Sequence, residues 1–425
     1  MRYASTRDPK TAVSLSEAVE AGLARDGGLF VPQRFPSLYL SDFGTASGLV
    51  DVGQILLAPF FDGDPLSDAL DDVCRESLDL HAPLVRLDDS NSVLELYHGP
   101  TAAFKDFGAR FLASLLSRVA SSEERALTVL TATSGDTGGA VGAGFHGRPG
   151  VRVVILYPAG RVSPRQEAQL TGWSDNVRTL RVRGDFDDCQ RLVKQAFADP
   201  DLRSRLRLTS ANSINLGRLL PQMVYYAHAA LEHLRERGEA PGFIVPSGNL
   251  GNAVACLWAR EMGVPIREVV LATNANAAIA GYMETGVWEP APTRTTLASA
   301  MDVGDPSNFE RLQHLASWAR LRRRVRAIRV PDEEIARQIR IGPEVWGRVW
   351  DPHTATAAAA LDQLEPRDWI LVATAHPAKF EATVEPLVGH ALEVPPALRQ
   401  LLGREPRFEE IDPSIDALRH CLLDP

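Results

Sequence analysis

The sequence predicts an α/β protein in which parallel sheets are covered by helices, with a separate lobe at the N-terminus. From residue 126 onward, strand-like apolar runs alternate with helix-like runs. This alternation is typical of parallel strands joined by helical crossovers. Two glycine-rich turns each follow a strand-like run and precede a helix-like one. Residues 1 to about 95 lack the alternation and contain a Gly-Gly turn at 27–28 and proline-containing connections.

The elements follow from local apolar patterns bounded by turn residues. Strands are expected at 127–132, 151–157, 177–182, 243–246, 269–273 and 369–374. Helices are expected at 14–24, 187–198, 216–237 and 253–262. A chain of 425 residues exceeds what one hydrophobic core usually serves, so two or three lobes are expected.

Lysine is rare in this chain. Lys and Arg together number 45, but only four of them are lysines: Lys10, Lys105, Lys194 and Lys379. Arginine cannot lose its proton near neutral pH, whereas a buried lysine can and is then able to form an imine. Lys105 lies in an apolar setting between Phe104 and Phe107, where its pKa should fall. The pattern therefore favours Lys105 as a reactive amine, with a surface lysine as the alternative.

The two glycine-rich turns indicate anion sites. One is TSGDTGG at 133–139, and the other is SGNLGN at 247–252. Glycines let backbone N–H groups converge, and a following helix adds the positive end of its dipole. Neither turn matches the P-loop or the Rossmann spacing. Such turns are also common packing devices, but with an imine-forming lysine they suggest pyridoxal phosphate, whose aldehyde and phosphate need these two kinds of partner.

A set of longer motifs is specific enough to indicate a family. They are HGPTAAFKD (98–106), TATSGDTGGA (131–140), GDFDDCQ (184–190), SANSIN (210–215), PSGNLGN (246–252), ATNAN (272–276), AMDVGDPSN (300–308) and TAHPAKF (374–380). On these motifs the chain resembles threonine synthases, which are pyridoxal-phosphate enzymes of the tryptophan-synthase-β structural type (fold type II). The N-terminal segment RYASTRDP…SLSEAVEAGLARDGGLFVP also fits that family.

The resemblance implies two parallel or mixed sheet lobes plus an N-terminal lobe. We expect residues 1–95 to form the N-terminal lobe, which is specific to threonine synthases. Residues 96–125 and 225–425 should form the large domain, which binds pyridoxal phosphate. Residues 126–224 should form a small mobile domain.

The resemblance also implies the residues that hold the cofactor. Lys105 would hold pyridoxal phosphate as an imine and then act as the general base at Cα and Cβ. Lys379 is the competing lysine, but no glycine turn lies near it in sequence and its motif is not the imine site in the family. Thr374 would face the pyridine nitrogen. The cofactor phosphate would be bound by Ser247, Gly248, Asn249, Leu250, Gly251 and Asn252.

Two further segments would bind the substrate. Ser134, Gly135, Asp136 and Thr137 would meet its α-carboxylate, although the charge of Asp136 should repel it. Asp136 is therefore either protonated or bonded to the backbone, and its role stays open. A substrate phosphate would be bound by Asn212, Ser213, Asn215 and Arg218 at a helix N-terminus. Helix capping is the alternative explanation for this last group, and it would suffice for Asn215.

The implied reaction converts O-phospho-L-homoserine and water into L-threonine and phosphate by γ-elimination and β-replacement. Two alternatives remain open. One is a phospho-lyase with the same cofactor site that releases 2-oxobutyrate. The other is a catalytically silent homologue that binds a metabolite.

Composition restricts the partners and the cellular location. The net charge of −9 argues against nucleic acid or an anionic membrane as the main partner. The sequence has no apolar stretch of spanning length and no signal-peptide pattern. Four widely spaced cysteines indicate reduced thiols without a metal or disulfide role, as expected in the cytoplasm. The expected partner is a small-molecule substrate, and both a monomer and a homodimer remain open.

Overall fold

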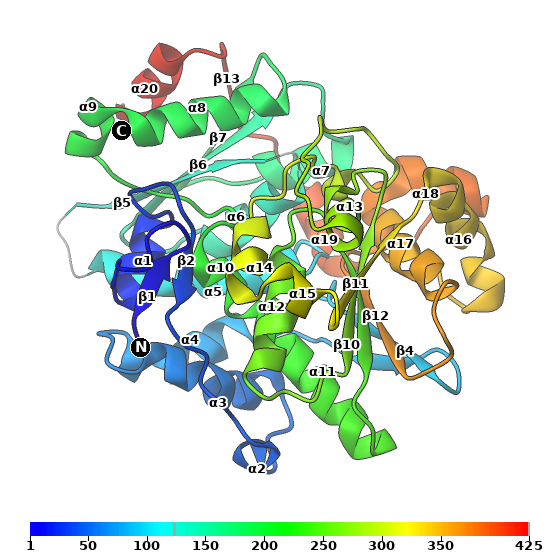
Figure 1. The fold of residues 1–425 in the computed structure, drawn as a ribbon. Helices are drawn as coiled ribbons and strands as arrows, with labels where there is room; N and C mark the ends of the chain where they lie inside the picture. The colour runs from blue at the N-terminus through cyan, green and yellow to red at the C-terminus, as the bar shows by residue number, and fades with distance from the viewer. Residues whose placement is uncertain (122–124, 134, 424–425) are drawn as a thin grey trace.

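Two sheets form the framework of the molecule (Figure 1). The computed structural model describes residues 1–121, 125–133 and 135–423. A six-stranded sheet has the order β11 (Val325–Arg329), β10 (Glu268–Thr273), β9 (Gly242–Pro246), β12 (Trp369–Ala373), β4 (Asn91–Glu95), β3 (Leu84–Arg86). A five-stranded sheet has the order β13 (Glu409–Ile411), β7 (Val177–Val182), β6 (Val151–Pro158), β5 (Leu127–Ala132), β8 (Arg207–Thr209). All neighbouring strands in these two sheets are parallel except β3 and β4.

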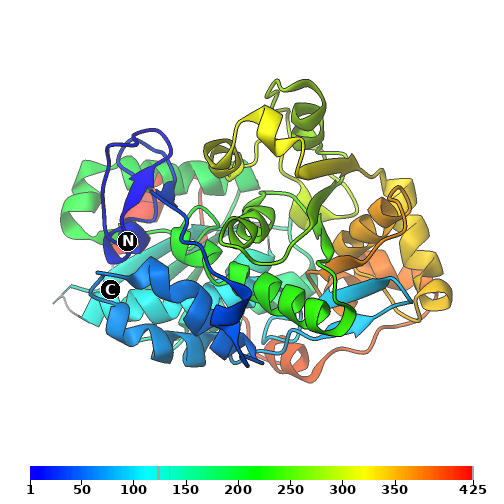
Figure 2. The same cartoon turned by 60° about the horizontal axis from the view of Figure 1, so that its bottom comes forward.

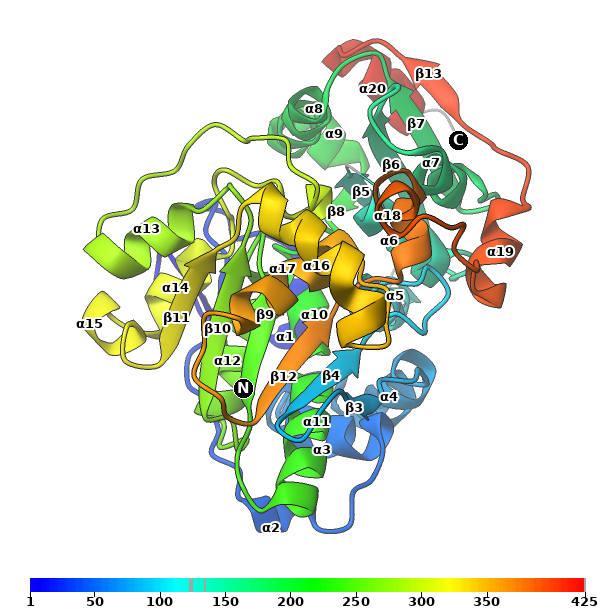
Figure 3. The same cartoon turned by 90° about the vertical axis from the view of Figure 1, so that its right-hand side faces the viewer.

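Helices cover both faces of the large sheet because its strands are apolar on both faces. Phe243 and Val245 of β9 face the same core as α11 (Gln222–Arg237) and α12 (Gly251–Glu261). Ile244, between them, packs in a second core with α16 (Asp332–Val345) and α17 (Pro352–Leu361). Figure 3 shows α16 and α17 in front of the sheet. The alternation of side chains along a strand therefore separates the two cores.

The small sheet is covered in the same way. Val153 and Ile155 of β6 belong to the core shared with α5 (Lys105–Ser121) and α6 (Asp136–Phe145). Val154 faces a third core with α8 (Phe186–Ala198) and α20 (Ile415–Leu423). One core thus runs from a face of the large sheet to a face of the small sheet, with α5 between them.

The N-terminal segment packs over this shared core. Its strands β1 (Tyr3–Ser5) and β2 (Phe30–Pro32) pair antiparallel. In Figure 2 this blue segment lies against the core helices, and α3 contacts α11 while α1 and α4 contact α5. Its helices are α1 (Leu15–Ala21), α2 (Leu40–Phe43), α3 (Leu49–Phe61), η1 (Ser67–Ala69) and α4 (Leu70–Ser77).

The remaining helices connect or flank these layers. They are α7 (Pro164–Thr171), α9 (Pro200–Arg205), α10 (Leu216–Leu219), α13 (Ala278–Thr285), η2 (Ser299–Met301), α14 (Phe309–Leu315), α15 (Trp318–Leu321), η3 (Pro377–Phe380), α18 (Glu381–Val388) and α19 (Pro396–Leu402). Within the described residues, no helix combines the length and the apolar character needed to cross a membrane.

The structure differs from the expected elements in two helices. The helix expected over 14–24 ends at Ala21, with Gly22 as its C-cap. The single helix expected over 216–237 is two helices, α10 and α11, because Pro221 follows α10 and stands at the N-cap of α11. Proline lacks the N–H that a continuous helix would need there.

Strand pairing also crosses the expected domain limits in two places. Strands β3 and β4 lie in the range 1–95 but belong to the large sheet, and β13 lies near the C-terminus but pairs with β7 in the small sheet. Single-strand contributions from distant chain segments leave no local signal in the sequence. The division into three domains stays a prediction, and strands β3, β4 and β13 pair outside the domains expected for them.

Candidate active site

Lys105 is the first residue of α5, and its position is fixed by contacts to the end of β12. The preceding loop bonds to the chain after β12 at two points. The Phe104 N–H donates to the Thr374 carbonyl at 2.8 Å, and the His376 N–H donates to the Ala102 carbonyl at 3.0 Å. Both lysine-bearing and threonine-bearing segments therefore meet at the carboxyl edge of the large sheet, where ligands of parallel sheets usually bind.

The Lys105 amine is suited to act as a nucleophile. Its side chain is half-buried, and Nζ makes no hydrogen bond or ion pair with any described residue. Burial lowers the pKa of Lys105 to about 8, with Asp136 opposing this effect and Lys379 and Arg218 adding to it. A useful fraction of the amine is therefore neutral near physiological pH, which nucleophilic attack on a carbonyl requires.

The turn 247–252 forms an anion cradle between β9 and α12. The N–H groups of Gly248, Asn249, Leu250 and Gly251 have no acceptor among the described residues. Leu250, at the N-cap of α12, has a φ of 63°. A Cβ on Gly248 would lie 2.7 Å from the Met301 Cα, so only glycine fits there. Unpaired N–H groups at a helix N-terminus fit the phosphate of pyridoxal phosphate.

Asn252 and Ser247 hold this cradle in shape. The Asn252 Oδ1 accepts hydrogen bonds from the hydroxyls of Tyr225 and Tyr226, the latter at 2.9 Å. The buried Nδ2 of Asn252 has no partner among the described residues, so it is a further donor beside the cradle. Ser247 donates its N–H to Ala272 and its hydroxyl to the Val245 carbonyl at 2.8 Å.

Thr374 follows β12 directly and is buried. Its carbonyl accepts from Phe104, while its hydroxyl makes no hydrogen bond with a described residue. The hydroxyl is thus available to a bound group beside Lys105. This fits the predicted contact with a pyridine nitrogen, which stays a prediction.

The turn 133–139 leads into α6. Ser134, predicted to bind substrate, lies outside the described residues. The Thr133 Oγ1 accepts from the N–H groups of Gly135 at 3.0 Å and Gly138 at 2.9 Å. Gly135 has a φ of 144°, a conformation that side-chain-bearing residues rarely adopt. Thr137 is half-buried on the first turn of α6, near the predicted position of the substrate carboxylate.

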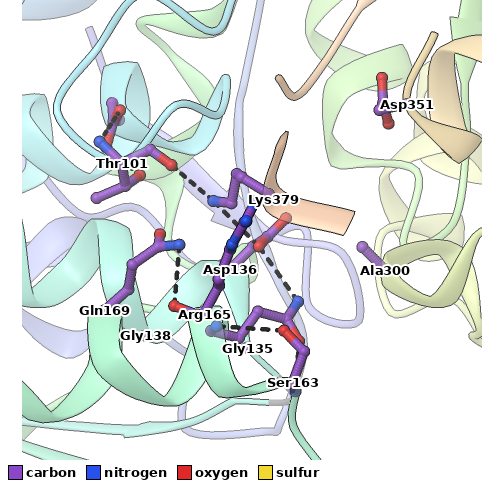
Figure 4. A network of polar contacts seen from close by, with 12 residues as sticks. Thr101, Gly135, Asp136, Gly138, Ser163, Arg165, Gln169, Ala300, Asp351 and Lys379 are labelled. Carbon is purple, nitrogen blue, oxygen red and sulfur yellow. Dashed lines mark hydrogen bonds and ion pairs between the residues drawn. The ribbon is translucent and has the colours of Figure 1, made fainter. Parts of the chain in front are cut away.

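Asp136 is ionised and paired, rather than protonated or bonded to the backbone. Its Oδ1 lies 3.1 Å from Nζ of Lys379, which also donates to the Thr101 carbonyl at 2.7 Å (Figure 4). Burial alone would raise the pKa of Asp136. The positive charges of Lys379 and Lys105, with a smaller contribution from His353, outweigh burial and hold that pKa well below its usual range.

The segment 212–218 contains a buried cation, Arg218, and a helix N-cap, Asn215. Arg218 is buried, donates through Nη1 to the Ala211 carbonyl at 2.5 Å, and leaves Nε without a partner in the described part of the chain. Burial lowers the pKa of Arg218 to about 10, and Asp106 partly opposes this. At that pKa the guanidinium is still charged near neutral pH, which suits an anion partner.

Asn215 has its polar atoms occupied by the protein. Its Oδ1 accepts from the Gly217 N–H at 2.9 Å, and its Nδ2 donates to the carbonyls of Val19 and Ser210, both at 2.9 Å. These are the bonds of an N-cap. Any contribution to a substrate phosphate is therefore indirect, through the placement of α10 and Arg218.

Asn212 and Ser213 lie between this segment and the cradle. The Ser213 Oγ accepts from the Asn249 Nδ2 at 2.6 Å, so the predicted substrate and cofactor segments touch. Asn212 keeps a buried Oδ1 without a partner among the described residues.

Sequence reasoning missed two buried cations at the site. Arg311 is fully buried and donates to the carbonyls of Ser213 and Ile214, at 3.2 and 2.7 Å, and to the Asn308 Oδ1 at 2.7 Å. The sequence pattern indicates Lys379 only as a competing imine site. The scarcity of lysine was the one available signal for Lys379, whereas no signal distinguished Arg311 from the other arginines.

Comparisons with known proteins agree with this geometry. The family model described as pyridoxal-phosphate dependent enzyme matches residues 83–374. The models described as threonine synthase N terminus and threonine synthase, C-terminal match residues 2–78 and 354–421. The predicted family, fold class and cofactor are therefore confirmed.

Individual relatives match over the whole chain. The threonine synthase of Escherichia coli K12 is 38% identical, with 100% of both chains covered. That of Serratia marcescens is 40% identical over 94% of this chain and 93% of its own. The crystal structure of a pyridoxal-phosphate-bound threonine synthase from Brucella melitensis superimposes with a TM-score of 0.92 at 34% identity, covering 99% of this chain and 98% of that one. The chain belongs to the threonine synthase family of pyridoxal-phosphate-dependent enzymes.

Proposed function

We propose that this enzyme converts O-phospho-L-homoserine and water into L-threonine and phosphate. The observation that carries the proposal is the position of the Lys105 amine, which has a pKa of about 8 and senses the charge of Asp136 at the start of α6. The second glycine-rich turn follows β9, which is the parallel neighbour of β12 in the large sheet. One turn suits a cofactor phosphate and the other a substrate carboxylate. The buried cation Arg218 lies on a third segment, where a second phosphate would be bound.

Pyridoxal phosphate supplies the electron-withdrawing ring that stabilises negative charge at Cα and Cβ of the amino acid. Lys105 would hold its aldehyde carbon covalently, and the N–H groups of Gly248 to Gly251 would hold its phosphate. The Thr374 hydroxyl would bond the ring nitrogen without protonating it. Once the substrate amine takes its place on the cofactor, Lys105 Nζ would move protons at Cα and Cβ.

Substrate orientation would depend on the two remaining segments. Gly135 and Thr137, together with Ser134, would bind the α-carboxylate at the start of α6. Arg218 and Ser213 would bind the γ-phosphate, with Asn212 beside them and Asn215 fixing the start of α10. A substrate bound at its α-carboxylate and its γ-phosphate would hold Cα and Cβ close to Lys105 Nζ, so that the protons can be transferred.

The bond changes balance without a further reactant. Protons leave Cα and Cβ, the Cγ–O bond breaks, and the phosphate leaves with its electron pair. The oxygen of one water molecule then bonds to Cβ, the proton that this water releases goes to the departed phosphate, and protons return to Cα and Cγ. Exclusion of bulk water before the Cγ–O bond breaks would protect the reactive species from hydrolysis.

The proposal extends to domain motion, cellular location and assembly. Residues 126–224 would move against the large domain on substrate binding, and β13 would move with them because it pairs with β7. A cytoplasmic location is supported by the four cysteines, which are all buried. Both a monomer and a homodimer are compatible with the site described above.

Phosphate release tests the substrate assignment. The enzyme with pyridoxal phosphate is incubated with O-phospho-L-homoserine, O-phospho-L-serine or L-homoserine, and phosphate and free amino acids are measured. Rapid phosphate release from O-phospho-L-homoserine alone, absent in Lys105→Ala, is expected. Equal release from O-phospho-L-serine would contradict the proposed substrate, because that compound carries its phosphate one carbon closer to Cα.

A further inference from the structure

Lys379 is a second lysine inside the site, and its charge is fully buried. Its side chain has no exposed surface, and Nζ contacts only two groups among the described residues, the Thr101 carbonyl and the Asp136 carboxylate. Taking an ammonium group out of water is unfavourable unless nearby groups compensate its charge. A buried charge of this kind must therefore be matched by its partners.

The pair joins segments that belong to both sheets. Thr101 precedes α5, Lys379 lies on η3 after β12, and Asp136 begins α6 beside the small sheet. Figure 4 shows Lys379 reaching from η3 toward both partners. Arg165 of α7 adds a second contact between the same regions, because it donates to the Ala378 carbonyl and lies 3.5 Å from Glu381.

The charges around Lys105 make this pair relevant to its protonation. Asp136 favours the charged amine of Lys105, and Lys379 and Arg218 disfavour it. Asp106 faces Thr101 and Lys379, with its carboxylate bound by the Thr101 N–H at 2.9 Å and hydroxyl at 2.6 Å. His353 of α17 faces Asp136, but its Nδ1 lies 2.6 Å from Asp351 and its Nε2 accepts from the Ala300 N–H. Lys379 is thus the one described cation in ion-pair contact with Asp136.

We propose that Lys379 is a positioning residue that binds the Asp136 carboxylate and keeps it from pairing with Lys105. Lys105 then retains a neutral amine that can bond to the cofactor. The inference rests on the proposed role of Lys105. It differs from a purely structural ion pair because it assigns opposite effects on Lys105 to the two partners.

Opposite effects follow from electrostatics alone. Without Lys379, Lys105 is the strongest remaining positive charge that acts on the Asp136 carboxylate, so the pKa of Lys105 rises. Without Asp136, the unpaired charge of Lys379 lowers it. Removal of both leaves Lys105 near its original pKa. A structural ion pair predicts instead that both single variants lose stability and that Lys105 titrates as before.

The test measures cofactor attachment against pH. Pyridoxal phosphate is added to the full-length chain after cofactor removal, and the initial rate of attachment is followed by absorbance. In this step the Lys105 nitrogen bonds to the aldehyde carbon, and the aldehyde oxygen leaves as water. Borohydride reduction and peptide mapping then identify the labelled lysine. The variants are Lys379→Met, Asp136→Asn and the double variant, with the exposed Lys194→Met as the matched control.

The wild type and Lys194→Met should show a rate midpoint near pH 8. Nearby charges shift pKa values by about one unit or more, so Lys379→Met should move the midpoint up by about one unit and Asp136→Asn should move it down by about one unit. The double variant should return to the wild-type midpoint.

Several outcomes would overturn the inference. An unchanged or lowered midpoint in folded Lys379→Met would do so, as would a double variant that retains the shift. Should Lys379→Met fail to fold, an unchanged midpoint in Asp136→Asn would have the same meaning. Labelling on a lysine other than Lys105 would instead overturn the proposed function, and the inference with it. If Lys105 is labelled but the pH midpoint of attachment is the same in all variants, the role of Lys379 is refuted while the proposed function stands.

Discussion

At the scale of single residues, the site depends on how lysine and arginine are distributed. Lys10 and Lys194 are exposed, whereas Lys105 and Lys379 both act on Asp136 and lower the pKa of its carboxyl group. Arginine serves where a permanent charge is sufficient, as at Arg218 and Arg311. The two remaining lysines occur where the amine must lose its proton, as at Lys105, or must be fully buried, as at Lys379.

Replacement of Lys105 tests its role directly. Lys105→Ala should abolish both covalent cofactor attachment and turnover, because no other described amine is accessible at this site. Lys105→Arg keeps the positive charge but cannot form the bond, so it should be equally inactive. Absorbance of the bound cofactor and borohydride labelling report the bond. Substantial turnover in either variant would refute the assignment.

The pH dependence of cofactor attachment has a definite sign. The neutral form of the amine reacts, and burial lowers the pKa of Lys105 to about 8. The attachment rate of the wild-type chain should therefore rise with pH and level off above that value, whereas an ordinary exposed lysine would continue to gain reactivity toward pH 10, about its usual pKa. A midpoint near 10, again about the usual lysine pKa, would show that burial does not activate Lys105.

At the scale of elements, the site depends on turns in which only glycine fits and on capped helix starts. The glycine turns could be recognised from the sequence because they follow apolar strands and precede helices. Their partners could not. Asn249 bonds Ser213, and Gly248 abuts Met301, through contacts between segments that are distant in the chain. Pro221 is a sequence signal for the break between α10 and α11, but the apolar pattern continues across it and favours a single helix.

Replacement of Gly135 should disturb the start of α6. Gly135→Ala introduces a Cβ 2.6 Å from Nε2 of Gln166 at a φ of 144°. Both the contact and the backbone conformation oppose the substitution, so the unfolding free energy should fall by roughly 1–3 kcal/mol. Substrate KM should rise as well. Gly147→Ala, at a φ of 73° with open space around it, is the matched control for the backbone conformation alone. Equal effects in both variants would refute a specific role for the turn.

Asn215 tests capping against direct substrate binding. Asn215→Ala removes one cap bond and two buried donor bonds, so stability should fall by about 1–3 kcal/mol in urea unfolding. Asn215→Asp keeps the acceptor for the Gly217 N–H but loses both amide donor bonds. Its carboxylate would then face the carbonyls of Val19 and Ser210, so its stability should also fall below that of the wild type. A large rise in KM for Asn215→Ala without loss of stability would favour direct contact with the substrate.

At the scale of the whole molecule, chain segments are exchanged between the two sheets. Alternating strands and helices in the sequence predicted the parallel sheets, and the strand limits of β5, β7 and β12 agree closely with the pattern. The membership of β3, β4 and β13 could not be predicted, because each is a short strand whose partners lie elsewhere in the chain. The same reason concealed the pairing of Lys379 with Asp136.

The C-terminal segment should stabilise the small sheet. Arg178 binds Glu409, and Leu418 and Leu422 fill the core beneath α8. Deletion of residues 405–425 would expose that core and the edge of β7, so the small sheet should unfold and become sensitive to protease. Limited proteolysis would show cleavage within 126–210 first. Unchanged resistance would mean that β13 and α20 contribute little to stability.

The product ratio tests the central claim most directly. The enzyme with pyridoxal phosphate is supplied with O-phospho-L-homoserine, and threonine, phosphate and 2-oxobutyrate are measured in the same sample. Threonine and phosphate should appear in equal amounts, with negligible 2-oxobutyrate, and both should be absent from Lys105→Ala. Phosphate accompanied mainly by 2-oxobutyrate would contradict the account, because water would then not be added at Cβ before the intermediate is lost.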